Sequence, residues 1–570
     1  MFPDSSTKIE TARAALTALV IALLLAALTP ATMLWDQDEG YYARTAAEML
    51  QTGNWLIPTF NGELFAHKPP LSYWLLAISM AVFGANEFAA RLPSAIALSG
   101  SAFLIFLIGR RMFNARVGWW AMAILSTALL PVYLGIAAMV DAPLLFSICL
   151  AIWAYVEMTW DRKRIWPMLA VFGLGVYLSL MVKGPVGPAV VITTVAASWL
   201  LLPAHQRVPF RYGVALAAAS LAALLLFFLW AIPANRISGG DLLSQGVGIH
   251  VVGRALSAME GHGGSGWAGY LATLPIYIPV LVLGFLPWTI HMPAAAHGLL
   301  TGWIGDRRER VVLWSWMTPT FVMFTLAATK LPHYIFPMFP AVALAVAAAI
   351  VATGEKDIAQ TATGDRRYFW FRIGRWFYLL SGLAGSVIVA ISPLLLPGVV
   401  GWPVALPLAG LLLAAHAFAA RPQLAGRPLA TSRAVLLVTP AVLFCLIWSL
   451  VPRIEPVIKA AKPMALEIAG AVEPQTRIYA QGYFEPSFIF YLDRPFDNPV
   501  LRIGESEAEL DRVLADDGKI VLVTTRQWLE AAEARAGGRL FDVLFEHEAL
   551  NVNRGARLQK LVAAVRGAAH

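Results

Sequence analysis

The chain has 570 residues, of which 58% are hydrophobic and 14% charged, and its mean hydropathy is +0.66. Soluble domains carry about 25% charged residues, so this composition predicts an α-helical integral membrane protein with many spans. The net charge of +8 does not indicate nucleic-acid binding, because the basic residues lie in short loops between apolar segments, where they act as topology signals. Cys149 and Cys445 both lie inside apolar segments, which excludes a disulfide framework and a CxxC metal site.

The first apolar segment follows Lys8 and Arg13 and has no clear small-residue cleavage site, so we expect an uncleaved first span. Apolar windows long enough to cross roughly 30 Å of hydrocarbon predict about thirteen spans in all. They lie at 14–34, 92–109, 117–136, 142–159, 165–182, 186–202, 212–233, 268–290, 311–329, 335–353, 373–395, 399–420 and 434–451.

Arginine clusters between the predicted spans decide the orientation. They lie at 110–116, 162–164, 207–211, 307–310, 366–375 and 421–433. With these spans, every cluster falls on the side of the N-terminus, which the positive-inside rule makes the cytoplasm. The apolar piece Leu71–Gly84 is left out of the count, because it is short for a crossing and would reverse every later cluster. We expect it to lie along the outer interface or to re-enter it, together with the amphipathic stretch Ala43–Leu50.

The tail after the last span predicts a small α/β domain on the outer side. Lys519–Thr524 has the pattern of a buried strand, and Glu505–Ala515 and Gln527–Ala536 have the pattern of helices. The tail contains no dinucleotide fingerprint and no Walker motif. We therefore predict two domains, a transmembrane domain over 1–451 and an outer α/β domain over 452–570.

The loop that follows the first span, Met33–Tyr73, gathers many charges beside the bilayer. Charged groups near hydrocarbon lose hydration and need partners or ligands. Its acidic run, Asp36, Asp38 and Glu39, offers carboxylates that can accept a proton, hold an acceptor group or coordinate a divalent cation. The alternative is a set of solvated acids. Because the unusual polar residues near the membrane gather on this one face, a functional site is favoured.

Cations and a second acid accompany these carboxylates on the same face. Lys68 precedes two prolines that fix the backbone, Lys183 ends a span, and Lys330 and Tyr334 share an outer turn. Phosphate binding is the function that such cations would serve. The alternatives are lysines that snorkel to lipid headgroups and a tyrosine of the aromatic belt. Asp141 begins a span and is either a carboxylate of the site or a helix N-cap.

The long outer loop Gly248–Gly264 holds His250, Arg254, Glu260 and His262 among glycines. An arginine fork beside a histidine suits a phosphate or a metal-bridged anion, although a surface histidine needs no such role. Carboxylates and cations on one face suit a reaction in which a phosphate leaves. The cations stabilise the developing negative charge, and a carboxylate positions or deprotonates the attacking group. Cations at the membrane edge favour a lipid phosphate as the donor.

An ordered set of motifs runs along nearly the whole chain. It comprises DQDEGYYARTAAEML, GNWLIPTFNGELFAHKPPLSYWLLAISMAVFG, EFAARLPSA, MVDAPL, LMVKGPVG, HVVGRAL, MEGHGG, LGFLPWT, ATKLPHYIFP and GYFEPSFIFYLDRP. This set resembles the lipid A aminoarabinose transferases and the related protein O-mannosyltransferases, which are GT-C glycosyltransferases that use polyprenyl-phosphate sugars. The resemblance implies a GT-C bundle in a bacterial inner membrane, with interfacial helices in the first outer loop. It also implies an active site and a C-terminal domain that face the periplasm.

The resemblance implies roles for individual positions. Asp38 corresponds to the family's essential loop carboxylate and Asp141 to its second carboxylate near the site. Lys68, Arg254 and Tyr334 correspond to the groups that hold the lipid phosphate. The complete expected set is catalytic Asp38, Asp141 and Glu39, and phosphate-binding Lys68, Arg254, Tyr334, Lys183 and Lys330.

A departure from the family concerns the residue before Lys-Pro-Pro. The aminoarabinose transferases usually carry an acid there, and this chain has His67. His250 corresponds to a family histidine implicated in metal binding, so His67 and His250 remain as the pair for a divalent cation, the one cofactor expected. The departure also leaves the sugar open, because protein O-mannosyltransferases place a histidine before their Pro-Pro.

The sequence thus predicts an inverting pentosyl- or hexosyltransferase that moves a sugar from undecaprenyl phosphate to lipid A or a related envelope acceptor. Protein O-glycosylation is the alternative within the enzyme class. A lipid-linked sugar transporter would place polar residues at the bilayer midplane or on both faces, whereas the spans here are nearly free of charge at their centres. A non-catalytic scaffold has no use for the carboxylates and cations.

Overall fold

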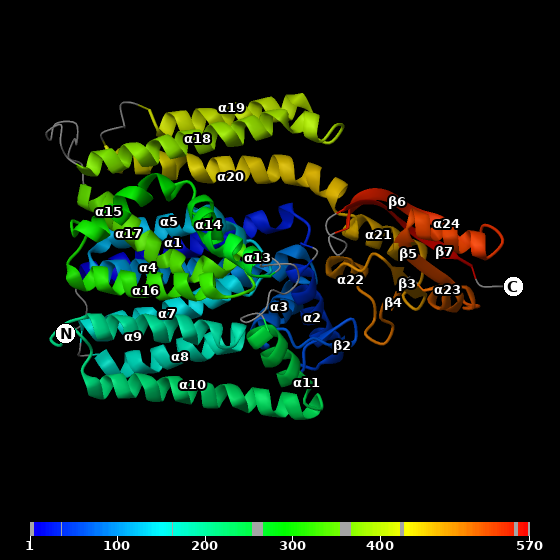
Figure 1. The fold of residues 1–570 in the computed structure, drawn as a ribbon, viewed down its shortest axis with the longest axis horizontal. Helices are drawn as coiled ribbons and strands as arrows, with labels where there is room; N and C mark the ends of the chain where they lie inside the picture. Colours follow the sequence, from blue (N-terminus) through cyan, green and yellow to red (C-terminus); the bar gives the residue numbers. More distant parts are fainter. Residues whose placement is uncertain are drawn as a thin grey trace.

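The computed structural model describes residues 5–35, 37–161, 164–253, 266–353, 366–421, 427–504, 506–551 and 557–567. Helices form one large block, and a smaller domain with a sheet projects from one end of it (Figure 1). The N-terminus lies at the opposite end of the block, and the C-terminus lies at the far edge of the small domain.

Ten helical segments in the described residues are long and apolar enough to cross a membrane, or eleven if the bent pair α5 and α6 is one span. The elements involved are α1 (Ser5–Leu28), η1 (Thr29–Ala31), α4 (Glu87–Met112), α5 (Ala115–Thr127), α6 (Leu129–Gly135), α7 (Asp141–Trp160), α8 (Ile165–Lys183), α10 (Phe210–Ile237), α13 (Gly266–Thr273), η4 (Leu274–Ile276), α14 (Tyr277–Gly284), η6 (Pro332–Met338), α17 (Phe339–Thr353), α18 (Arg366–Leu395), α19 (Trp402–Ala419) and α20 (Pro428–Ile458).

The predicted count of about thirteen spans is not confirmed, and two helices account for the difference. α9 (Val186–Leu201) has 16 residues, which is short for a span. α16 (Arg307–Leu326) is long enough, but it carries charged residues in its first turn, which the predicted window 311–329 left out. The two helices pack against each other and run alongside the neighbouring helices of the block (Figure 1).

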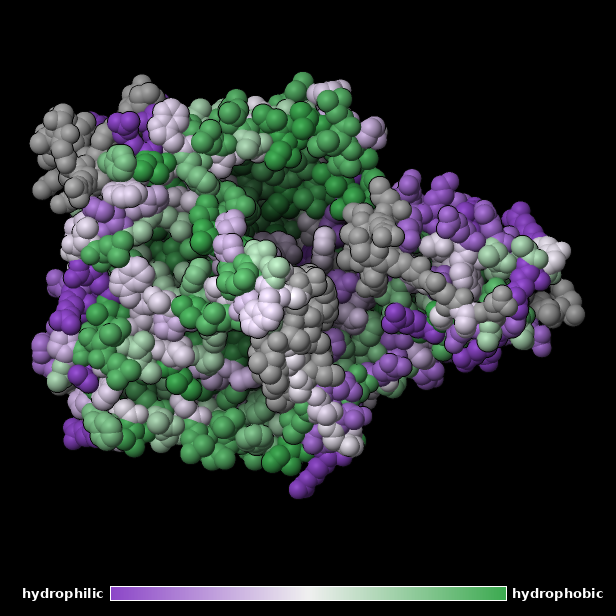
Figure 2. Space-filling model, in the orientation of Figure 1, coloured by the Kyte–Doolittle hydropathy of each residue, from purple (hydrophilic) through white to green (hydrophobic). Residues whose placement is uncertain are grey.

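The arginine clusters meet at the end of the block that holds the N-terminus. Arg110, in the last turn of α4, donates to the Thr7 carbonyl oxygen at 3.3 Å. Arg111 forms an ion pair of 3.4 Å with Glu157 in the last turn of α7, and Arg308 of α16 donates to a carbonyl oxygen in that same turn. Hydrophilic residues accordingly gather along this end of the molecule (Figure 2). These contacts agree with the expectation that the clusters share one side of the membrane.

The first outer loop lies at the other end of the block, beside the small domain (Figure 1). It contains α2 (Asp38–Thr52), the short strands β1 (Thr59–Phe60) and β2 (Glu63–Leu64), and α3 (Leu71–Phe83). α2 ends at Gly53, whose φ of 68° suits a residue without a Cβ. α3 has 13 residues, packs against α2 and α4 and is too short to count as a candidate span.

Short elements connect the remaining helices. α11 (Asp241–Leu243) and η3 (Ser244–Gly253) follow α10, and η5 (Trp288–His291) and α15 (Met292–Thr301) follow α14. A Cβ on Gly246 of η3 would lie 3.0 Å from the Ala66 carbonyl oxygen. The outer loop after α10 therefore contacts the segment that leads to Lys68.

The small domain has a five-stranded mixed sheet of order β4-β3-β5-β7-β6. β3 (Arg477–Gln481) pairs in parallel with β4 (Leu501–Ile503) and β5 (Ile520–Thr525), and β7 (Arg557–Arg566) pairs antiparallel with β5 and with β6 (Asp542–Asn551). The helices are α21 (Ala461–Ala471), α22 (Pro486–Leu492), α23 (Glu507–Leu514) and α24 (Arg526–Arg535). The strand and the two helices predicted in the tail are confirmed as β5, α23 and α24.

The last span continues beyond the predicted domain boundary. α20 is one helix up to Ile458, whereas the sequence placed the boundary at 451 because apolar residues thin out there. The final turns of α20 therefore lead almost directly into α21, and they bring Glu455 and Lys459 to the connection before the first outer loop.

Candidate active site

Three of the expected site residues meet at the end of the block nearest the small domain. Asp141 begins α7, Lys183 ends α8, and Tyr334 lies in η6. The Lys183 ammonium lies 2.7 Å from Asp141 Oδ1 and 5.2 Å from the centre of the Tyr334 ring. The N-cap of α7 is Val140, so Asp141 does not serve as the cap that the sequence left open. Asp141 is instead the carboxylate of a buried ion pair with Lys183.

The second oxygen of Asp141 points to a ligand. Asp141 is only 3% exposed, and its Oδ2 accepts no hydrogen bond from the described residues. Lys68 lies close enough to attract its negative charge, and His333 is a further neighbour. Because buried polar atoms are normally hydrogen-bonded, this oxygen is available to a hydroxyl or an amine of a substrate.

Asp38 stands at the start of α2 and is half-buried. It accepts a hydrogen bond of 3.3 Å from the Tyr42 hydroxyl. Its charge also acts on His333, as does that of Asp141, so the two carboxylates share one neighbourhood. Burial and the Asp38 charge hold the pKa of Tyr73 well above its usual value, which keeps this phenol a neutral hydrogen-bond donor beside the site.

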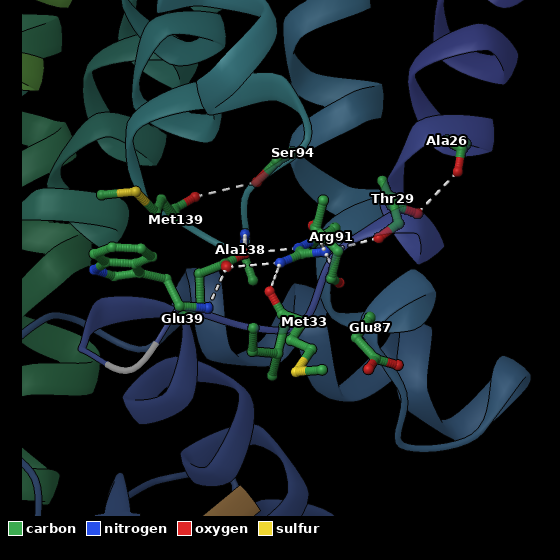
Figure 3. A network of polar contacts seen from close by, with 12 residues as sticks. Ala26, Thr29, Met33, Glu39, Glu87, Arg91, Ser94, Ala138 and Met139 are labelled. Atoms are coloured by element: carbon green, nitrogen blue, oxygen red, sulfur yellow. Dashed lines mark hydrogen bonds and ion pairs between the residues drawn. The ribbon is translucent and has the colours of Figure 1, made fainter. Parts of the chain in front are cut away.

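Glu39, the next residue, belongs to a different network (Figure 3). Its carboxylate binds the Arg91 guanidinium through two contacts of 2.8 Å and accepts from the backbone N–H groups of Ala138 at 2.6 Å and Trp35 at 2.7 Å. Burial raises the pKa of Glu39, but Arg91 and these donors outweigh it and bring the pKa below its usual value. These bonds engage both oxygens and hold the start of α2 against α4, and the catalytic role expected for Glu39 stays a prediction.

Arg91 uses its remaining N–H groups to fix the connection between α1 and α2. It donates to the carbonyl oxygens of Thr29, Thr32 and Met33, each at 2.7 Å. The guanidinium thus ties α4 to the segment that precedes Asp38. Sequence reasoning missed Arg91, although a charged residue inside an apolar helix is itself a signal of function or of a buried partner.

The residues before the two prolines are arranged by aromatic contacts. The His67 ring stacks on Phe65 with centroids 4.0 Å apart and lies 5.9 Å from the Tyr41 ring. The Lys68 ammonium donates to the His67 carbonyl oxygen at 3.1 Å. The charge of Lys68 also acts on Asp141, which places this lysine near the Asp141–Lys183 pair.

Two expected residues cannot be placed in this geometry. Arg254 lies outside the described residues, and so does the side chain of His250. Among the side chains that the structure describes, no three histidines, cysteines or acids lie together as metal ligands. The expected metal pair of His67 and His250 therefore stays a prediction, and no catalytic step below is derived through a metal.

Lys330 is a further cation of this layer. It is 4% exposed, donates to the Ala327 carbonyl oxygen at 2.6 Å and lies 4.4 Å from the centre of the Tyr270 ring. In the described ranges no carboxylate pairs with it. A buried ammonium without a carboxylate suits an anionic ligand. The same turn contributes His333, which sequence reasoning missed although it lies between two chosen residues.

The arrangement of the helices defines the class of protein. Over 98% of both chains, the fold matches ArnT from Cupriavidus metallidurans in the apo state, with a TM-score of 0.73 and 18% identity. ArnT bound to undecaprenyl phosphate gives a TM-score of 0.72 and 17% identity over 97% of both chains. The chain is therefore a multi-span membrane protein with the fold of ArnT.

Sequence comparisons narrow this class. A family model described as dolichyl-phosphate-mannose-protein mannosyltransferase matches residues 67–232. Undecaprenyl phosphate-alpha-4-amino-4-deoxy-L-arabinose arabinosyl transferases are 29% identical in Shewanella sediminis and 30% identical in Sodalis glossinidius, over 56% and 58% of this chain. The matched regions span 57% and 58% of the length of those relatives. The chain is thus similar in sequence to these arabinosyl transferases over part of their length and to the mannosyltransferase family over 67–232.

Proposed function

We propose that this chain is an inverting glycosyltransferase that moves one sugar from undecaprenyl phosphate to lipid A or a related envelope acceptor. The observation that carries the proposal is the cluster of buried Asp141 with half-buried Lys183 and Tyr334, with its open carboxylate oxygen, beside Lys68 and Asp38. The relatives named above act on the same kind of donor. The site lies at the end of the block opposite the arginine clusters, so the proposal places it on the periplasmic face of the inner membrane.

The proposed reaction is a displacement at the anomeric carbon. The acceptor oxygen attacks from the side opposite the donor phosphate, a bond to the acceptor forms, and the bond between the sugar and the phosphate oxygen breaks. Lys68 and Lys330 stabilise the leaving phosphate, and we assign Arg254 the same task. Each charge-assisted contact contributes about 1.5–3 kcal/mol. We also assign Tyr334, whose ring lies against the Lys183 ammonium, to the group that binds the phosphate.

The two carboxylates take different tasks. Lys183 occupies one oxygen of Asp141, so the other is left to bind a hydroxyl or an amine of the sugar. Asp38 is half-buried and bonds only weakly to Tyr42, which leaves it accessible to an acceptor. A hydroxyl acceptor needs Asp38 as a general base, whereas an ionised lipid A phosphate needs it for positioning.

Mass spectrometry of lipid A tests the proposal. It compares cells with and without the gene and cells that carry Asp38→Asn. A sugar-sized mass that is absent in the deletion and in the Asp38→Asn cells supports transfer to lipid A. Glu63→Gln, an exposed acid in the same loop, is the matched control and keeps the modification. Full modification by Asp38→Asn at normal expression would overturn the role of Asp38.

Protein O-glycosylation is the second candidate function. It is favoured by the match to the mannosyltransferase family model over 67–232 and by His67 in front of the two prolines. Unchanged lipid A, together with a polyprenyl-phosphate sugar that accumulates in the deletion strain, would support this candidate. Glycopeptide analysis of the envelope proteins then identifies the acceptor.

A further inference from the structure

The connection between α1 and α2 has an unusual backbone environment. Met33 N–H donates to Glu455 Oε2 at 2.6 Å, and Leu34 N–H donates to the Tyr491 hydroxyl at 2.7 Å. The carbonyl oxygens of Met33 and Leu34 accept from the Lys459 ammonium at 3.3 and 3.5 Å. Backbone groups of a connection normally bond to backbone or to water. Here side chains from distant parts of the chain bond to both groups of two consecutive residues.

These side chains are themselves held in place. Lys459 and Glu455 form an ion pair of 2.8 Å, and they are 5% and 7% exposed. The Tyr491 hydroxyl donates to Glu87 Oε1 at 3.0 Å, and Glu87 also pairs with Lys462. Each partner thus has a second bond that fixes its orientation. Buried networks whose members are all bonded are rigid, so the backbone that they hold is also rigid.

The partners come from the end of α20 and from the small domain. Glu455 lies in the last turn of α20, Lys459 follows that helix, and Tyr491 lies in α22. α22 also packs directly on α2, because a Cβ on Gly40 would lie 2.3 Å from the Ser487 nitrogen. The small domain therefore touches both the connection that precedes Asp38 and the helix that begins with it.

We propose that Glu455, Lys459 and Tyr491 form a clamp on Met33 and Leu34 that positions Asp38 for the transfer reaction. The proposal rests on the proposed function. Arg91 holds the same connection from the membrane side, and the clamp holds it from the side of the small domain. Reaction rates are sensitive to such support, because a displacement of about 1 Å can cost a factor of about 100. The three residues act through Asp38 and are positioning residues.

Tyr491→Phe tests the clamp in the full-length protein, since it removes only the hydroxyl. We expect kcat to fall about tenfold with KM for the donor within about twofold, because the substrate contacts remain while Asp38 is less well held. Tyr479→Phe is the matched control. Its hydroxyl donates to Asp516 at 2.8 Å within the same domain and does not touch the connection, so its kcat stays unchanged.

Hydrogen–deuterium exchange provides a readout that does not depend on turnover. Tyr491→Phe should speed exchange in the peptide that contains Leu34, and Tyr479→Phe should leave it unchanged. Lys459→Arg keeps donors for the two carbonyl oxygens and retains kcat, whereas Lys459→Met lowers it. If Tyr491→Phe folds poorly, kcat and exchange at Leu34 are compared between Lys459→Met and Lys459→Arg.

The outcomes separate this inference from the proposed function. If Tyr491→Phe has the kcat of the wild type and the same exchange rate at Leu34, the clamp is overturned. An equal fall in kcat for Tyr479→Phe would overturn it too, because the effect would then come from the domain's general stability. Faster exchange at Leu34 in a chain that transfers no polyprenyl-linked sugar would support the clamp as a structural device and reject the proposed function.

Discussion

At the scale of single residues, Lys183 joins two side chains that are far apart in the sequence, Asp141 and Tyr334. We expect Lys183→Met to lower the melting temperature and to abolish transfer, because a buried carboxylate without its partner costs about 3–5 kcal/mol. Adding Asp141→Asn should restore stability, since an amide needs no counter-charge, but it should not restore transfer. Thermal unfolding in detergent and a transfer assay measure both effects. A double variant as unstable as Lys183→Met would contradict the buried pair.

A control for this prediction lies in the small domain. Arg535 and Asp511 form an ion pair of 2.8 Å that is largely exposed. Exposed pairs contribute little, because water screens them and their side chains lose freedom when they pair. Arg535→Met should therefore leave the melting temperature nearly unchanged, which separates the effect of burial from that of charge removal.

Glu39 should make the thermal stability of the protein depend on pH in the acid range. Its pKa in the folded protein lies below the usual value of 4.5 because of Arg91 and the backbone donors. A lowered pKa contributes stability that is fully present above the unfolded pKa and is lost as the pH falls through the folded one. The difference in melting temperature between the wild type and Glu39→Gln should be constant near neutral pH and shrink below pH 4.5. Melting curves across this range check the prediction, and a difference that grows on acidification would contradict it.

At the scale of elements, the packing of α2 on α22 depends on Gly40. A Cβ there would lie within 2.8 Å of three backbone atoms of Pro486 and Ser487, which cannot move independently. We expect Gly40→Ala to separate the two helices and to reduce transfer, with Asp38 itself unchanged. Gly213→Ala in α10 is the matched control, because a Cβ there meets nothing within 4 Å. Equal activity of the two variants would show that this close contact is dispensable.

At the scale of the whole molecule, the N-terminus lies at one end of the helical block, and the C-terminus lies beyond the other end, at the far edge of the small domain (Figure 1). If the bent pair α5 and α6 is one span, the described residues hold eleven candidate spans, an odd number of crossings, and the number stays odd if α9 and α16 also cross. We expect alkaline phosphatase fused after residue 567 to be active and the same enzyme fused at Arg421, beside an arginine cluster, to be inactive. Activity of the Arg421 fusion alone would reverse this topology, and activity of both fusions would reject it.

The sequence determined the class of this protein, because hydropathy windows and the arginine rule depend on neighbours along the chain. For the same reason it placed the carboxylates and cations on one face and predicted β5, α23 and α24 in the tail. It did not separate α16 from an ordinary span, since the apolar window left out the charged first turn of that helix, and it ended the last span before the turns of α20 that carry Glu455.

Only the tertiary structure decided what each charged group binds. Asp38 and Glu39 are neighbours with the same chemistry, but successive side chains on a helix point about 100° apart. One therefore faces the site, and the other meets Arg91 from α4. The pairing of Asp141 with Lys183 and the hold of Tyr491 on Leu34 likewise join distant segments. Such partners follow from how the helices and the small domain pack together, which no local pattern in the sequence encodes.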